Sequence, residues 1–200
     1  MKHAIIVAHP NANSFNLSVA RAYHDAVLEL GHTAVTRDLY RCGFDPRLLE
    51  EEIPKPAGFE PGADVKAERA LIGDADVFAF VYPLWFNAPP AMLTGYVQRV
   101  FGMGFGYGSI NKGSNQHLLL GRLMIGFSSS GAPSEWLREE GGWAAIQTLF
   151  DNHLAAVCGM TVVDHRHFGR ILGATPAARI EAHLKDVRET AARHFGKYRR

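Results

Sequence analysis

The chain has 200 residues, of which 47% are hydrophobic, so it can bury the core of one domain, and we expect a single domain over residues 1–200. Its 21 basic and 20 acidic residues nearly cancel, which argues against a protein that binds nucleic acid by bulk charge. No apolar run reaches the ~18 residues of a membrane-spanning helix, and the two cysteines, Cys42 and Cys158, exclude a disulfide scaffold. Free thiols and a short apolar stretch at the N-terminus predict a cytoplasmic protein.

The first part of the chain alternates a strand, a helix and a strand. Residues 4–8 form a short, β-branched apolar run that ends at His9-Pro10, which is typical of a strand buried on both faces. Apolar residues then recur at helical spacing over 17–30, and Gly31 stands where a helix commonly ends. Residues 33–39 predict the second strand.

A long irregular excursion follows over residues 41–61, with room for one short helix. Asp64 is placed to cap a helix that runs to about residue 72, and residues 77–82 predict a third buried strand. Pro89-Pro90 then opens another helix, because proline is favourable at the first helical position.

The last part of the chain repeats the alternation. A fourth strand is expected over 123–127, a helix over 143–157, a fifth strand from residue 160 to about 167, and a final helix after Thr175-Pro176. Five strands alternating with helices predict an α/β fold with a parallel sheet covered on both faces, and five strands favour the order 2-1-3-4-5. Ligands bind such sheets at the carboxyl ends of the strands, where the strand order reverses.

The segment after the first strand suits an anion such as phosphate. His9, Ser14 and Asn16 can donate hydrogen bonds there, and a helix start adds unpartnered backbone N–H groups and the positive end of its dipole. Alternatively, Ser14 or Asn16 only caps the helix. The segment has no glycine-rich signature of a P-loop or a Rossmann dinucleotide site.

The segments after the third and fourth strands are also unusual. Trp85 and Phe86, flanked by three prolines within residues 83–90, can present backbone groups and apolar surface to a flat heteroaromatic ring, although aromatic core or dimer packing is the alternative. Residues 127–131 form a small polar turn that could bind the edge of such a ring. This turn nearly matches the nucleophile elbow of hydrolases, but both possible frames miss one glycine, so a hydrolase is not favoured.

Two further motifs have less specific interpretations. His165 and His167 lie on one face of the fifth strand, and without acidic companions nearby we expect surface or interface histidines rather than a metal site. Residues 101–108 alternate glycine with apolar residues, which fits either a mobile flap or a structural loop.

Three motifs together resemble the flavodoxin-like family of NAD(P)H:quinone oxidoreductases, whose branches include the modulators of drug activity, the ancillary flavoproteins of potassium-efflux systems and, more remotely, the azoreductases. They are Ala8-His9-Pro10 with Ser14-Phe15-Asn16, the run from Pro83-Leu84-Trp85-Phe86 through Pro90 to Phe101, and Phe105-x-Tyr107. The resemblance implies a homodimer with one flavin per subunit at the dimer interface.

The resemblance also implies a role for each matching residue. His9, Ser14, Phe15 and Asn16 would hold the phosphate end of the flavin; Pro83, Leu84, Trp85, Phe86 and Asn87 would line the isoalloxazine; Ser128, Ser129, Ser130 and Gly131 would meet its polar edge; and Phe105 and Tyr107 would form part of the substrate pocket above the ring. Trp136, in a stretch that departs from the family, is also expected to contact the substrate. No protein side chain is predicted to be catalytic and no metal is expected, because the flavin carries the chemistry.

The implied reaction passes a hydride from NAD(P)H through the flavin to a quinone-like acceptor by a ping-pong mechanism, and Ser14-Phe15-Asn16 resembles the branch that binds FAD rather than FMN. The chain departs from the mammalian-type enzymes because residues 134–141 contain neither the Tyr nor the His that those enzymes place after the fourth strand. The alternatives are a flavoprotein subunit that regulates a membrane transporter and a flavodoxin-type electron carrier.

Overall fold

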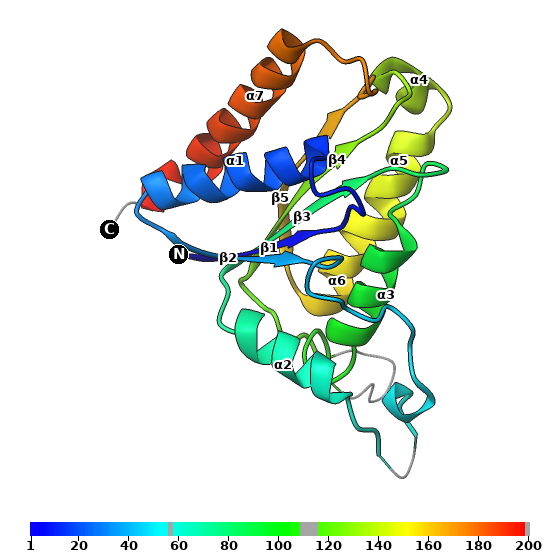
Figure 1. Ribbon diagram of the computed structural model, residues 1–200. Helices are drawn as coiled ribbons and strands as arrows, with labels where there is room; N and C mark the ends of the chain where they lie inside the picture. The colour runs from blue at the N-terminus through cyan, green and yellow to red at the C-terminus, as the bar shows by residue number, and fades with distance from the viewer. Residues whose placement is uncertain (56–57, 109–115, 199–200) are drawn as a thin grey trace.

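A five-stranded parallel sheet with the order β2-β1-β3-β4-β5 forms the centre of the computed structural model, which describes residues 1–55, 58–108 and 116–198 (Figure 1). This order is the one that the sequence predicts. The strands are β1 (Lys2–Val7), β2 (Thr33–Asp38), β3 (Val77–Pro83), β4 (Leu123–Ser129) and β5 (Thr161–Phe168).

Two long helices, α1 (Phe15–Glu29) and α7 (Ala177–Phe195), cover one face of the sheet (Figure 1). Their apolar sides bury Tyr23 and Phe195 against Phe127 of β4. Gly31 follows α1 with a φ of 80°, a left-handed conformation that glycine adopts without a steric penalty.

Shorter helices cover the other face: α2 (Ala63–Ile72), α3 (Ala91–Val100), α5 (Gly142–Ile146) and α6 (His153–Cys158). The single helix predicted over 143–157 is in fact α5 and α6 joined by a π-helical segment, Gln147–Asn152, and the sequence analysis did not predict the short helix α4 (Ser134–Glu139). Such π-helical turns are often found at functional sites.

The excursion over residues 41–61 contains one short 3₁₀ helix, Glu50–Glu52, and an ion-pair cluster holds it against α3. The buried guanidinium of Arg99 binds Glu52 at 2.7 Å and Asp64 at 2.7 Å. Asp64 therefore does not cap α2, as the sequence analysis expected, because Gly62 is the capping residue and Asp64 pairs with Arg99 instead.

β5 contains a one-residue bulge. Met124 pairs with Val162 but Ile125 pairs with Asp164, so Val163 is an extra residue in the ladder. Asp164 consequently faces α7, where it binds His194 at 3.0 Å. His165 then faces the other side of the sheet, where its ring lies 4.8 Å from that of Trp143 in α5. The bulge thus decides which side chains of β5 face the α5 side.

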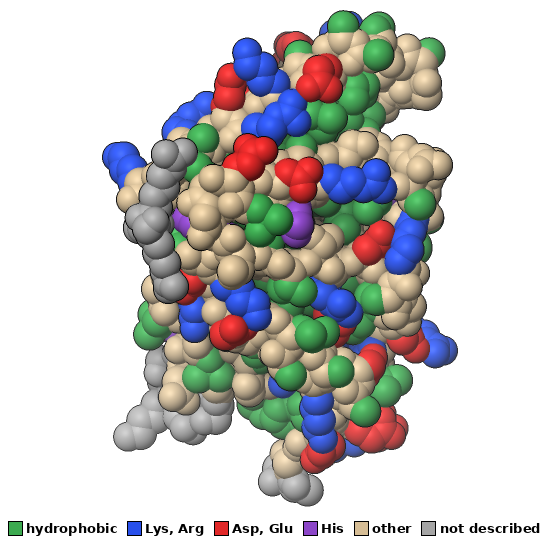
Figure 2. Space-filling model, turned by 60° about the vertical axis from the view of Figure 1, so that its left-hand side comes forward, with side chains coloured by type: hydrophobic (Ala, Val, Ile, Leu, Met, Phe, Trp, Pro, Cys, Tyr) green, Lys and Arg blue, Asp and Glu red, His purple; other side chains and the backbone are tan. Residues whose placement is uncertain are grey.

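Acidic and basic side chains are interspersed on the face shown in Figure 2, with no large patch of one sign. In the described part of the chain, no helix is both long enough and apolar enough to cross a membrane.

Candidate active site

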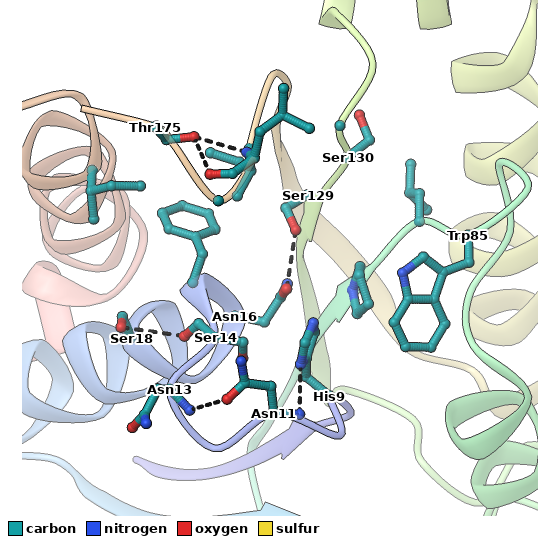
Figure 3. Close-up of a pocket in the computed structure, with 18 residues that line it drawn as sticks. His9, Asn11, Asn13, Ser14, Asn16, Ser18, Trp85, Ser129, Ser130 and Thr175 are labelled. Atoms are coloured by element: carbon teal, nitrogen blue, oxygen red, sulfur yellow. Dashed lines mark hydrogen bonds between the residues drawn. The ribbon is translucent and has the colours of Figure 1, made fainter. Parts of the chain in front are cut away.

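A cavity of about 460 Å³ opens at the carboxyl edge of the sheet, where the strand order reverses between β1 and β3 (Figure 3). Among the described residues, none of those lining it is Asp, Glu, Lys or Arg. The lining residues are His9, Asn11, Asn13, Ser14, Phe15, Asn16, Ser18, Pro83, Leu84, Trp85, Ser129, Ser130, Gly131, Ile171, Leu172, Gly173, Thr175 and Ile180.

The start of α1 forms one wall of the cavity. Ser14 is the N-cap residue, and its Oγ accepts a hydrogen bond from the N–H of Leu17 at 3.3 Å. Asn11 orders the approach to the helix, because its Oδ1 accepts from the N–H of Asn13 at 2.9 Å. The capping role that the sequence analysis weighed for Ser14 is therefore present, and the helix start still offers its first N–H groups to the cavity.

His9 lies at the end of β1 and is held from two sides. Its Nδ1 accepts from the N–H of Asn11 at 3.1 Å, so Nε2 bears the proton and can donate. Arg41 of the excursion donates to the carbonyl oxygens of His9 at 2.8 Å and Pro10 at 2.7 Å. Burial, together with the positive charge of Arg41, lowers the pKa of His9, which keeps this imidazole neutral.

The bend after β3 presents aromatic surface to the opposite wall. Trp85 and Ala88 exchange two backbone hydrogen bonds, and the residues between them, Phe86 and Asn87, have φ values of 52° and 55°, as in a type I′ turn. Positive φ is unusual for a phenylalanine, and the turn points this ring fully into solvent. Leu84 is buried beneath the bend, and Trp85, half-exposed, lies with its ring 5.8 Å from that of His9.

The polar turn after β4 completes the cavity and ties it to α1. The hydroxyl of Ser129 donates to Asn16 Oδ1 at 3.1 Å, so the amide NH₂ of Asn16 remains as a donor (Figure 3). Ser130 donates from its Oγ to the carbonyl of Ala132 at 2.9 Å. This edge of the cavity therefore offers hydroxyl and amide groups to a polar ligand.

Ten of the thirteen residues that the sequence predicts for the cofactor line this cavity, and Phe86, Asn87 and Ser128 do not. The predicted substrate residues lie elsewhere in the single chain. Phe105 is buried in the core against Phe78 and Phe101, Tyr107 borders a separate hollow with Arg69, and Trp136 is half-exposed on α4.

The sequence analysis expected surface or interface histidines at 165 and 167, but both rings face the α5 side of the sheet near Trp143, where His167 is half-buried. The His165 side chain is 1% exposed and its Nδ1 lies 2.7 Å from Asp151 Oδ2, while its Nε2 lies 2.8 Å from Ser128 Oγ. The sequence analysis missed Asp151, because the π-helical segment brings this carboxylate to a strand 14 residues away. Among the described residues, no group of three His, Cys, Asp or Glu side chains is arranged to hold a metal ion.

Comparison with known proteins decides the family. Residues 1–191 match the family described as having a flavodoxin-like fold. An uncharacterized NAD(P)H oxidoreductase of Haemophilus influenzae is 34% identical over 172 residues, which cover 86% of this chain and 85% of that protein. The chain belongs to the flavodoxin-like family of NAD(P)H:quinone oxidoreductases.

Solved structures agree with this assignment. An NAD(P)H:quinone oxidoreductase from Methanothermobacter marburgensis is 28% identical, with a TM-score of 0.85 over 96% of this chain and 97% of that one. An FMN-dependent NADH-azoreductase from Bacillus anthracis, solved in complex with FMN, shares the fold at 18% identity, with a TM-score of 0.69 over 96% of this chain and 98% of that one. By membership the chain is an oxidoreductase, as the sequence analysis predicted.

Proposed function

We propose that this protein binds a flavin in the carboxyl-edge cavity and transfers a hydride from NAD(P)H to a quinone-like acceptor. The observation that carries the proposal is the position of the cavity between two complementary walls, a helix start on one side and the Trp85 bend on the other. Its volume of about 460 Å³ lies within the usual range for cofactor sites.

The donor chemistry of the cavity fits a flavin phosphate and ring. A phosphate needs N–H and O–H donors without nearby carboxylates, and the α1 start, Asn16 and the neutral His9 supply them. The apolar surfaces of Pro83, Leu84 and Trp85 suit a flat ring. When bound, the flavin supplies the two-electron chemistry, and the protein supplies position and polarity.

We favour FAD over FMN, because a second hollow of about 320 Å³ adjoins the first and shares Gly131, Leu172 and Thr175 with it. Arg170 and Arg179 line this second hollow and could meet the further phosphate of a dinucleotide. FMN would use the first hollow alone, so the two flavins should differ in their sensitivity to changes at Arg179.

The ping-pong mechanism follows from a single shared access to the ring. If the ring rests on the bend at Trp85, one face is left toward the opening, where the nicotinamide and the quinone would bind in turn. The proposed homodimer would cover exposed apolar side chains, such as Phe86 of the bend after β3 and Leu149 of the π-helical segment. In the single chain Phe105 and Tyr107 lie away from the cavity, so their predicted substrate role requires a second copy.

The decisive experiment adds FAD or FMN to the purified chain and measures the dissociation constant by quenching of flavin fluorescence. We expect tight binding, bleaching of the bound flavin by NADH or NADPH, and recovery of the colour with a quinone. Trp85→Ala should weaken flavin binding at least tenfold, whereas Leu120→Ala, which removes an exposed leucine outside the cavity lining, should leave it unchanged.

Absence of binding by either flavin would overturn the proposal. A bound flavin that neither nicotinamide nucleotide reduces would instead favour the regulatory-subunit role, and accumulation of one-electron-reduced flavin would favour an electron carrier.

A further inference from the structure

A continuous chain of hydrogen bonds runs from a buried carboxylate to the wall of the cavity. Asp151 Oδ2 lies 2.7 Å from His165 Nδ1, and His165 Nε2 lies 2.8 Å from Ser128 Oγ. Ser128 Oγ lies 3.0 Å from His167 Nδ1, and His167 Nε2 lies 3.1 Å from Ser130 Oγ. Only the last member, Ser130, lines the cavity.

The direction of each hydrogen bond follows from the one proton that a serine hydroxyl can donate. Ser130 donates to the carbonyl of Ala132, so it accepts from Nε2–H of His167. A neutral His167 then accepts at Nδ1, and Ser128 must donate to it. Burial, His165 and Arg138 lower the pKa of His167 to about 4, in agreement with a neutral ring.

Ser128 has no second proton, so it accepts from Nε2–H of His165. His165 and Asp151 then share a further proton across the 2.7 Å between Nδ1 and Oδ2. The His165–Asp151 pair therefore holds two protons, one of which points along the chain toward the cavity.

The fold makes room for these hydrogen-bonded side chains at a cost in stability. A Cβ on Gly126 would lie 2.7 Å from His165 Cγ, so only glycine fits opposite this ring. Asp151 is 2% exposed, and its second oxygen, Oδ1, has no hydrogen-bond partner among the described residues. The same holds for the hydroxyl of Tyr82, whose ring lies 5.9 Å from that of His165. Burying a carboxylate in this way contributes little to stability, which points to another role.

We propose that Asp151, His165, Ser128, His167 and Ser130 form a proton relay that delivers one proton to the cavity during reduction of the acceptor. The proposal rests on the proposed function. Reduction of a quinone to a hydroquinone takes up two electrons and two protons, and the hydride of NAD(P)H brings both electrons but only one proton. The relay supplies the second proton.

The transfer is balanced at every position. Ser130 turns its hydroxyl from the carbonyl of Ala132 toward the cavity, releases that proton there, and takes one from His167 Nε2. His167 Nδ1 takes the proton of Ser128, and Ser128 takes that of His165 Nε2. The His165–Asp151 pair keeps the proton between Nδ1 and Oδ2. Proton shifts in the reverse direction, starting from water in the cavity, then return the second proton to the pair.

Asp151, His165 and Ser128 follow the order acid, imidazole and hydroxyl of a nucleophilic triad, but they do not form one. Ser128 is fully buried, does not line the cavity, and uses its proton for His167. The titratable or charged groups that face the imidazoles are Asp151, Tyr82 of β3, the two histidines themselves, and Arg138 of α4.

The first test reads the protons directly and needs no turnover. In ¹⁵N-labelled full-length protein, with and without flavin, NMR should show His167 protonated at Nε2 only and a strongly downfield exchangeable proton on His165 Nδ1. Asp151→Asn should abolish the downfield signal. A His167 protonated at Nδ1 only, or a spectrum that Asp151→Asn does not change, would overturn the relay whether or not the protein reduces quinones.

The second test uses the flavin-loaded protein, reduced with NADPH and mixed with a quinone in a stopped-flow instrument at pH 8. Asp151→Asn should slow this step about tenfold, leave the flavin dissociation constant within twofold, and regain rate when imidazole is added as a proton donor. A merely structural role for Asp151 would give no rescue by imidazole, and that outcome rejects the relay.

The protein offers a matched control for the Asp151→Asn substitution. Asp164 also pairs with a histidine, His194, at 3.0 Å, but it lies on the opposite face of β5. Asp164→Asn should leave the quinone step within twofold of the wild-type rate. If the wild type itself binds flavin but fails to reduce quinone, the proposed function fails, and the NMR test still decides the arrangement of protons.

Discussion

The structure contains two hydrogen-bonded histidine clusters near opposite ends of the sheet, and they differ in what they connect. At the amino end, His3 Nδ1 lies 2.9 Å from the hydroxyl of Tyr23, and its Nε2 lies 3.0 Å from His32 Nδ1. Toward the carboxyl end, His165 and His167 link a carboxylate to the wall of the cavity. Imidazoles with hydrogen bonds at both ring nitrogens therefore take part in two different kinds of network.

The difference lies in the groups at the two ends of each network. Neither His3 nor its partners Tyr23 and His32 line the described wall of the cavity. Burial and the neighbouring His32 lower the pKa of His3 to about 3, so this ring is neutral and has no additional proton to give. A buried histidine without further neighbours of this kind therefore only packs in the core. A proton path becomes possible where the imidazole has a carboxylate on one side and the cavity on the other.

The largest expected effect comes from filling the space that Gly126 leaves for His165. Gly126→Ala places a methyl group 2.7 Å from His165 Cγ, so the ring or the strand must move. We expect a loss of about 3 kcal/mol in the free energy of unfolding, measured by urea denaturation. Gly173→Ala, which meets no atom within 4 Å, should cost less than about 0.5 kcal/mol, and an equal loss in both variants would contradict the steric explanation.

Acid should weaken the fold through the neutral histidines of both clusters. A histidine whose folded pKa is lowered stabilises the protein fully above its unfolded pKa, and this stability is lost as the pH falls toward the folded pKa. For His3, with a folded pKa of about 3, the loss between pH 7 and pH 4.5 is about 2–3 kcal/mol. His3→Gln should reduce the pH dependence of urea unfolding by that amount, and an unchanged dependence would show that His3 does not titrate as described.

Substitutions in the two histidine clusters should differ in their effect on the rate of quinone reduction. His167→Gln keeps a polar side chain but cannot pass a proton between its ends, so the quinone step should slow about tenfold, or ~1.4 kcal/mol in the barrier. His3→Gln should leave this step within twofold. Stopped-flow rates of both variants with bound flavin test the contrast, and equal slowing would remove the functional distinction between the clusters.

The smallest effect is expected at Tyr82, whose buried hydroxyl, near the His165 network, has no hydrogen-bond partner in the part of the chain that the structure describes. Tyr82→Phe should change the free energy of unfolding by less than about 0.5 kcal/mol, because no hydrogen bond is lost. Tyr96→Phe is the matched control, since this equally buried tyrosine donates to Glu68 at 3.2 Å. It should cost about 1–2 kcal/mol, and a similar cost at Tyr82 would reveal a partner for its hydroxyl.

The sequence predicts the sheet and the cavity well for a physical reason. Strands buried on both faces, such as Val77–Pro83, must be apolar throughout, and the residues that follow them reach the carboxyl edge whatever the packing elsewhere. His9, Asn16 and Trp85 were therefore found from their positions after predicted strands.

The features that the sequence analysis missed depend on contacts between distant segments. Arg41 holds the His9 turn from 32 residues away, and Arg99 pairs with Glu52 from 47 residues away. Phe105 follows a helix within a glycine-rich segment, and only the folded packing shows that it is core. The positions of His165 and His167 depend on Asp151 and on a bulge whose position no local pattern indicates.

The bulge at Val163 has a consequence for comparing related chains. Side chains of a strand alternate between its two faces, but the extra residue lets Val163 and Asp164 both face the α7 side before the alternation resumes at His165. Deletion of Val163 would therefore leave Asp164 opposite Ile125 and His165 opposite Gly126, with both imidazoles still on the α5 side. A relative with a regular strand could build the same relay with one residue fewer, so an alignment should place a one-residue gap at Val163 and keep the histidines in register.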